Sequence, residues 1–168
     1  MTPSLILHLW NRASALFIRT SVLFIATPAL LISLMALGCP RPGPGVIHYD
    51  SDACDHCRMT ISDPGFASQL VTRTGKVYRF DDPACLASFV ASGRVAHADV
   101  HSIWVNDHAR PEKSINAQDA VFVVSDRIRA PMNGRMATFG SENEAAALRS
   151  AVGGVVRTWA DVLKQVPQ

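Results

Sequence analysis

The hydrophobic and polar positions of this chain repeat with an offset of about sixty residues. In each half, two short segments of alternating polarity lead through a phenylalanine into a helix-like segment, and a further alternating segment follows. The strands are expected at residues 67–73, 76–80 and 101–105 in the first half and at 120–124, 135–139 and 154–157 in the second. This pattern predicts an α+β fold built from two small strand-strand-helix-strand modules.

Polar residues mark where the predicted helices begin. Asp81 can cap the first helix, with Pro83 in its first turn, and Ser141 with Glu144 can form a capping box for the second. A glycine follows each helix, as is common after a helix C-terminus. A short helix over 158–165 is expected to close the chain.

An apolar leader without acidic residues precedes the modules. Residues 1–38 carry Arg12 and Arg19 and then an almost unbroken apolar run, which is typical of a bacterial secretory signal. The segment Ala36-Leu37-Gly38-Cys39 resembles a lipobox, so we expect Cys39 to be lipidated and to anchor an exported protein to a membrane, facing the periplasm. An uncleaved signal anchor is the alternative, because about 17 apolar residues lie at the short limit of a membrane span.

The segment after Cys39 is rich in proline and glycine, which predicts a tether. The expected organisation is a signal peptide, a lipidated tether and the two modules, over residues 1–38, 39–45, 46–106 and 107–168. The two leader arginines account for the whole formal charge of +2, so the remaining chain is formally neutral. It therefore lacks the basic footprint that nucleic-acid binding requires.

The segment Cys54-Asp-His-Cys57-Arg-Met59 concentrates two thiols and a thioether in six residues. Such sulfur ligands are soft and select Cu(I) over harder divalent ions. Met132 lies in a turn-like segment between two predicted strands, where an apolar side chain is hard to bury. If the two halves pack together, this turn can bring a second thioether to the thiols. The candidate ligands of Cu(I) are therefore Cys54, Cys57, Met59 and Met132.

Other interpretations of the two thiols remain open. A c-type haem site is excluded, because Arg58 and not histidine follows Cys57. A thioredoxin-like redox pair needs a helix after its first cysteine, and the helix-breaking residues at 62–65 leave little room for one. A structural zinc site needs four ligands. A plain Cys54–Cys57 disulfide would only stiffen the loop. Cys85 falls in the first predicted helix and is expected to be a buried structural thiol. No nucleophile–base pair is apparent, so we expect no enzymatic activity.

Further segments complete a family pattern around this loop. They are Thr60-Ile61, Phe66-Ala-Ser-Gln69, Phe80-Asp-Asp, Val105-Asn-Asp107, Ile115-Asn-Ala-Gln-Asp-Ala120-Val-Phe-Val123, Pro131-Met132 and Gly153-Gly154-Val155. With the cysteine loop, they resemble the NosL family, the lipoprotein accessory factors of nitrous-oxide reductase maturation in denitrification. The chain departs from the family pattern at Arg58, where glycine is common, and at Asn133, which separates Met132 from the following glycine.

The resemblance implies a fold similar to that of the organomercurial lyase MerB, with two strand-strand-helix-strand modules. It also implies a copper chaperone that binds Cu(I) and delivers it to the copper centres of nitrous-oxide reductase, with membrane-associated maturation proteins as partners. Cys57 and Met132 are the ligands it indicates first, then Cys54 and Met59. The ligands can come from one chain or two, so a homodimer is considered. A thiol oxidoreductase using Cys54 and Cys57 and a structural zinc lipoprotein are the alternatives.

Overall fold

The computed structural model describes residues 42–166. The predicted signal peptide, the lipidation site Cys39 and the first part of the tether lie outside the described residues. Between residues 42 and 166, no helix has both the length and the apolar character needed to cross a bilayer.

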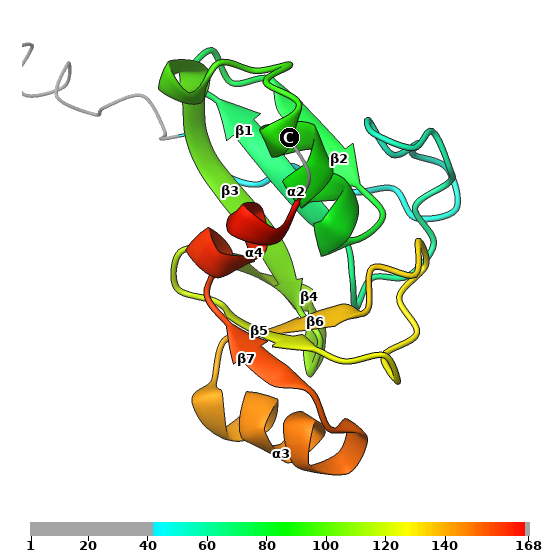
Figure 1. The fold of residues 1–168 in the computed structure, drawn as a ribbon. Helices are drawn as coiled ribbons and strands as arrows, with labels where there is room; N and C mark the ends of the chain where they lie inside the picture. The colour runs from blue at the N-terminus through cyan, green and yellow to red at the C-terminus, as the bar shows by residue number, and fades with distance from the viewer. Residues whose placement is uncertain (1–41, 167–168) are drawn as a thin grey trace, which may run out of the picture. The chain divides into compact units, whose positions relative to one another are not determined.

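The first half forms a four-stranded antiparallel sheet with one covering helix (Figure 1). Its elements are β1 (Ser68–Thr72), β2 (Val77–Phe80), α2 (Pro83–Ala91), β3 (Val100–Asp107) and β4 (Arg110–Asn116), and the strand order is β2-β1-β3-β4. A short 3₁₀ turn, His97–Asp99, leads into β3. Of these strands, β4 was not predicted. It is an edge strand whose residues are mostly exposed or half-buried, so its hydrophobic pattern is too weak to be recognised.

The second half forms a three-stranded antiparallel sheet with the order β6-β5-β7. Its elements are β5 (Val121–Val124), β6 (Met136–Phe139), α3 (Glu142–Val152), β7 (Val155–Arg157) and α4 (Trp159–Gln165). Strand-strand-helix-strand order therefore occurs twice, and the predicted α+β architecture is confirmed.

Two helix starts differ in detail from the sequence prediction. Asp82, and not Asp81, caps α2, because Pro83 occupies the first helical position and the cap is the residue before it. The predicted capping box at the start of α3 does not form, since Ser141 makes no side-chain capping bond. Glu144 instead accepts a hydrogen bond from Arg110 of β4 at 2.9 Å. The side chain of Glu144 thus ties α3 to β4 of the four-stranded sheet.

Both modules contribute to one large cluster of buried hydrophobic residues. The ring of Phe80 in β2 lies 5.0 Å from that of Phe89 in α2, and the rings of Phe122 and Trp159 lie 5.8 Å apart in the same cluster of buried residues. Through Trp159, the last helix of the second module packs against the first module, and α4 lies beside α2 (Figure 1). This shared cluster fixes the position of α2, whose first turn carries Cys85.

Candidate metal centre

The loop that carries Cys54 and Cys57 is a tight turn tied to the first sheet. The backbone N–H of Cys54 donates to the carbonyl of Met59 at 2.8 Å, and the N–H of Arg58 donates to the carbonyl of Cys54 at 3.0 Å. Asp55 and Arg79 of β2 exchange two hydrogen bonds, each 2.8 Å long. The turn therefore has little freedom to move away from β2, and its thiols are held in place.

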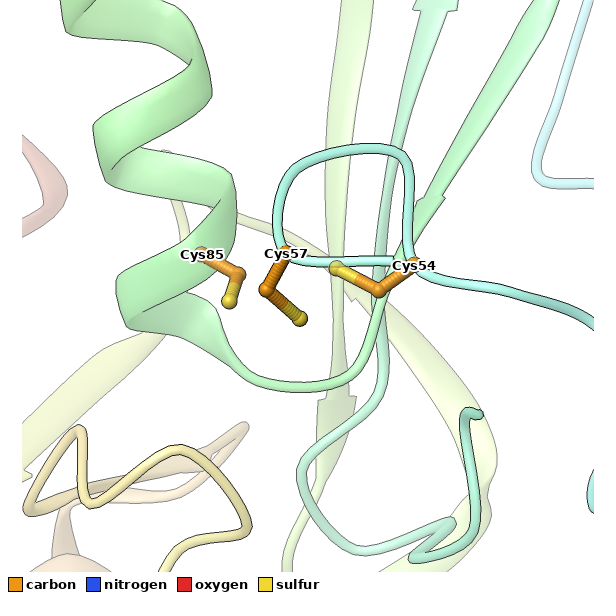
Figure 2. Close-up of side chains that lie close together, drawn as sticks. All are labelled: Cys54, Cys57 and Cys85. Atoms are coloured by element: carbon orange, nitrogen blue, oxygen red, sulfur yellow. The ribbon is translucent and has the colours of Figure 1, made fainter. Parts of the chain in front are cut away.

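Cys85 reaches the same place from the first turn of α2. The Asp82 carboxylate accepts a hydrogen bond from the backbone N–H of Cys85 at 2.8 Å, which fixes the start of the helix. The sulfur atoms of Cys54, Cys57 and Cys85 all lie within 4.8 Å of one another. In Figure 2 the three side chains converge, Cys85 from the helix and the other two from the loop.

The three thiols differ in exposure. Cys54 is completely buried and Cys85 is buried, whereas Cys57 is half-buried. All three are free cysteines in the structure. The cluster is thus closed on the side of the core and open toward solvent at Cys57.

Hydrogen bonds within the cluster make Cys54 the thiolate. The Cys85 thiol donates to the Cys54 sulfur, and this bond lowers the pKa of Cys54 from 9.0 to about 5 against the opposing effect of burial. Backbone N–H groups of Cys57, Asp81 and His56 contribute to the lowering in the same way. The same thiol–thiolate bond raises the pKa of Cys85, and burial raises that of Cys57. The resting cluster therefore holds one thiolate beside two thiols.

Beside Cys54, two buried side-chain atoms have no hydrogen-bond partner. They are the Oδ1 atom of Asp81 and the Nδ1 atom of His56. Desolvation raises the pKa of the Asp81 carboxyl. Neither side chain belongs to the group of atoms that converges with the three sulfurs, so the cluster itself consists of thiols.

The side chains of the two candidate thioether ligands are exposed to solvent. The relative exposure of Met59 is 58% and that of Met132 is 40%. Met59 is two residues from Cys57, in a turn where Arg58 holds a left-handed φ of 68°. A glycine would adopt this φ without strain. The assignment of Met59 and Met132 as metal ligands stays a prediction.

The loop carrying Met132 is attached to the start of α2. The backbone N–H of Met132 donates to Oδ2 of Asp82 at 3.3 Å, while Oδ1 of the same carboxylate caps Cys85. A Cβ atom on Gly134 would lie 2.6 Å from that Oδ2 atom and 2.7 Å from the Cβ of Ala84, so only glycine allows this close approach. Asp82 therefore connects the Met132 loop with the helix turn of Cys85.

The cluster has the dimensions of a three-coordinate soft-metal site. With metal–sulfur bonds of about 2.3 Å, three sulfurs in a trigonal plane lie about 4 Å apart, which is compatible with the observed 4.8 Å limit. Thiolates are the ligands that Cu(I) prefers. Tetrahedral zinc needs a fourth ligand, and in the described part of the chain no histidine or carboxylate joins the three sulfurs.

The contribution of Cys85 was not found from the sequence. A thiol in the first turn of a helix was interpreted as a buried structural residue, and Cys85 is indeed buried. Its position relative to the loop depends on how α2 packs, which the local pattern does not contain. The available signal was the cysteine count: of the four cysteines, three remain if Cys39 is lipidated, and a third thiol without a disulfide partner is suited to a metal site.

Fold and site together define a small α+β protein with a three-thiol cluster suited to a soft metal ion. Residues 46–167 match the family model of NosL, and the chain belongs to the NosL family. Over 124 residues it is 30% identical to the copper-binding lipoprotein NosL of Stutzerimonas stutzeri, which covers 70% of this chain and 65% of that protein. The chain thus matches slightly less than two thirds of that relative's length.

A solved structure has the same fold. The crystal structure of the copper chaperone NosL from Shewanella denitrificans matches with a TM-score of 0.63 at 24% identity. The match covers 77% of this chain and 98% of that chain. It therefore spans nearly the whole of the solved domain and includes both modules.

Proposed function

We propose that this protein is a Cu(I) carrier that holds one ion among the sulfurs of Cys54, Cys57 and Cys85. The observation that carries the proposal is the convergence of these sulfurs within 4.8 Å. The names of the two relatives, a copper-binding lipoprotein and a copper chaperone, support the choice of metal. A carrier needs no turnover, and the proposed role is non-enzymatic.

Met59 and Met132 are proposed as additional ligands on the exposed side. Cys54 and Cys85 are buried, whereas Cys57 is half-buried and both thioethers are exposed. An acceptor can therefore replace ligands one at a time from the solvent side, starting with the thioethers. This order allows Cu(I) to move between proteins without release of the free ion.

The proposed setting is the periplasmic face of a membrane. A lipid on Cys39 would hold the carrier there, as the name of the lipoprotein relative suggests. The family supports nitrous-oxide reductase as the destination of the copper and its membrane-associated maturation proteins as partners. Confinement to the membrane would raise the effective concentration of the carrier near them.

The first test is an anaerobic Cu(I) competition titration of residues 40–168 with a chromophoric chelator. This fragment contains the whole described hydrophobic core. We expect one tightly bound ion, and Cys85→Ser should weaken binding by more than about tenfold, because it removes one of three soft ligands. Zn(II) provides the metal control.

The thioethers need a matched control. Met59→Leu with Met132→Leu should weaken Cu(I) binding, but less than Cys85→Ser. Met136→Leu should leave it unchanged, because Met136 packs against the core. The carrier proposal fails if the protein does not compete with the chelator for Cu(I) and Cys54 and Cys57 form a reversible disulfide instead. Thiol–disulfide redox chemistry would then be the function of the cysteine loop. If binding persists unchanged in Cys85→Ser, the third thiol is not a ligand.

A further inference from the structure

The three thiols of the cluster differ in their access to a reagent in solution. Cys54 and Cys85 are buried, with relative exposures of 0% and 4%, whereas Cys57 is half-buried. Arg58 and Met59, which follow Cys57 in the turn, are exposed. The reaction of a cysteine with a dissolved reagent depends on this access. Of the cysteines that the structure describes, Cys57 is therefore the one that a reagent meets first.

Cys57 also has two thiols close to its sulfur atom. The sulfurs of Cys54, Cys57 and Cys85 lie within 4.8 Å of one another, and all three cysteines are free. Figure 2 shows the three side chains converging. If Cys57 forms a mixed disulfide with a small molecule, a neighbouring thiol can displace that molecule from the Cys57 sulfur. The cluster thus combines one accessible thiol with buried thiols that can resolve its mixed disulfide.

The backbone favours Cys54 over Cys85 as the resolving thiol. The N–H of Arg58 donates to the carbonyl of Cys54 at 3.0 Å, so Cys54 and Cys57 lie in one closed turn. A tight turn brings Cα atoms three residues apart to within about 7 Å, and a disulfide commonly spans about 5–7 Å. Cys85 instead belongs to α2, whose start is fixed by the 2.8 Å bond to Asp82. A bond from Cys57 to Cys85 would have to join two separately held segments.

We propose that Cys57 is a site of thiol–disulfide exchange with low-molecular-weight disulfides, and that the reaction ends in a Cys54–Cys57 disulfide that no longer holds Cu(I). The proposal rests on the proposed carrier function and concerns the regulation of the same site. An exported protein works in a compartment where disulfides form and persist. Bound Cu(I) occupies the sulfurs and blocks the exchange, so the reaction switches off the empty carrier and spares the loaded one.

The exchange balances in two steps. The Cys57 sulfur loses its proton and attacks one sulfur of the external disulfide, which forms the mixed disulfide and releases one external thiolate. The Cys54 sulfur, as a thiolate, then attacks the Cys57 sulfur and displaces the second external thiolate. The two released thiolates take up the protons that the two cysteines have lost. The cysteines are thereby oxidised by two electrons, and the external disulfide is reduced to two thiols.

The test treats the reduced, metal-free fragment 40–168 with glutathione disulfide in the absence of oxygen. Samples are quenched with acid at successive times and analysed by mass spectrometry. We expect a transient adduct with one glutathione on Cys57, followed by a product without glutathione that has lost one hydrogen atom from each of two thiols.

A peptide map of the parent identifies the thiols that react. Trypsin cleaves after arginine and leaves Cys54 and Cys57 together in the peptide 40–58, whereas Cys85 lies in the peptide 80–94. We expect the disulfide to lie within the first peptide, and fragmentation should place the transient glutathione on Cys57. Glutathione that appears first on Cys54 or Cys85, or a main product that links the two peptides, would overturn the proposal.

Serine variants test the two roles. Cys57→Ser should react more than about tenfold more slowly, because the remaining thiols are buried. Cys54→Ser should accumulate the mixed disulfide on Cys57. Cys85→Ser is the matched control, since it also removes one buried thiol, and it should still form the internal disulfide. A Cys57→Ser variant as fast as the parent, or a Cys85→Ser variant that stops at the mixed disulfide, would contradict the assignment. Urea unfolding checks that each variant is folded, and the parent's peptide map decides the proposal where one is not.

Cu(I) titrations separate this proposal from the carrier function. The disulfide form should bind Cu(I) at least about tenfold more weakly than the reduced form, because it has lost two soft ligands. Loading with Cu(I) beforehand should suppress the glutathione adduct. Equal affinities of the two forms, or equal adduct formation with and without Cu(I), would overturn the switch. A reduced parent that binds no Cu(I) would instead refute the carrier function, and the peptide map, which needs no metal, would still decide the exchange at Cys57.

Discussion

The thiolate of Cys54 should make the stability of the metal-free protein depend on pH. Its pKa is lowered from 9.0 to about 5, first by the hydrogen bond from the Cys85 thiol. Cys54 is completely buried, so solvent screens these bonds little. Because the folded pKa is depressed, the stabilisation is fully present above the unfolded value of 9.0 and is lost as pH falls through the folded value of about 5.

The magnitude follows from proton linkage. Between pH 5 and pH 9 the unfolded chain holds a proton that the folded chain has released, so the free energy of unfolding should rise by about 1.4 kcal/mol per pH unit. Near neutral pH this amounts to about 2–3 kcal/mol relative to pH 5. Above pH 9 the gain from Cys54 should level off, because the unfolded chain then releases the same proton. Stability should fall there through Cys85, whose raised pKa keeps a proton bound in the folded state that the unfolded chain has released.

The assay is urea unfolding of the reduced, metal-free fragment 40–168 across this pH range. Cys54→Ser is the control, since it removes the ionisable thiol and leaves every histidine and carboxylate in place. Between pH 5 and pH 9, the difference between the two pH profiles gives the contribution of the Cys54 thiolate together with its hydrogen bond to Cys85. Thiolate absorbance in the ultraviolet gives the titration directly, and Cys85→Ala should move it toward higher pH.

Parallel stability profiles of the parent and Cys54→Ser would refute this reasoning. Thiolate absorbance that develops only near pH 9 would do the same, because Cys54 would then have an ordinary pKa. Cys85→Ala without effect on the titration would show that the hydrogen bond between the two thiols is not its main cause.

Three further changes test how the site is held, each by urea unfolding. Arg58→Gly should stabilise the protein by about 1 kcal/mol, because it relieves a left-handed φ of 68°; Arg58→Ala, which keeps a Cβ, should not. Gly134→Ala should cost about 1–3 kcal/mol, since its Cβ would lie 2.6 Å from Asp82; Gly43→Ala, with nothing within 4 Å, should be nearly neutral. Asp82→Ala should cost about 2 kcal/mol through the lost helix cap and the lost bond to the β5–β6 loop, and an unchanged unfolding midpoint would exclude this dual role.

Long-range packing explains what was missed in the fold. Strand β4 is polar because it lies at a sheet edge, and its identity depends on pairing with β3. The predicted capping role of Ser141 failed because Glu144 found a partner, Arg110, more than thirty residues earlier in the chain. The shift of the α2 cap from Asp81 to Asp82 was a local error of one residue, set by Pro83.

The sequence by itself determined the repeated module, the soft-ligand loop and the position of Met132 in an exposed turn. These features depend on hydrophobic period, turn residues and ligand chemistry, all of which act between near neighbours. Only the tertiary structure decided that Cys85 joins Cys54 and Cys57. That meeting requires α2 to pack on the first sheet while Asp55 and Arg79 hold the cysteine loop against β2. Such contacts join residues far apart in the chain, and no local pattern specifies them.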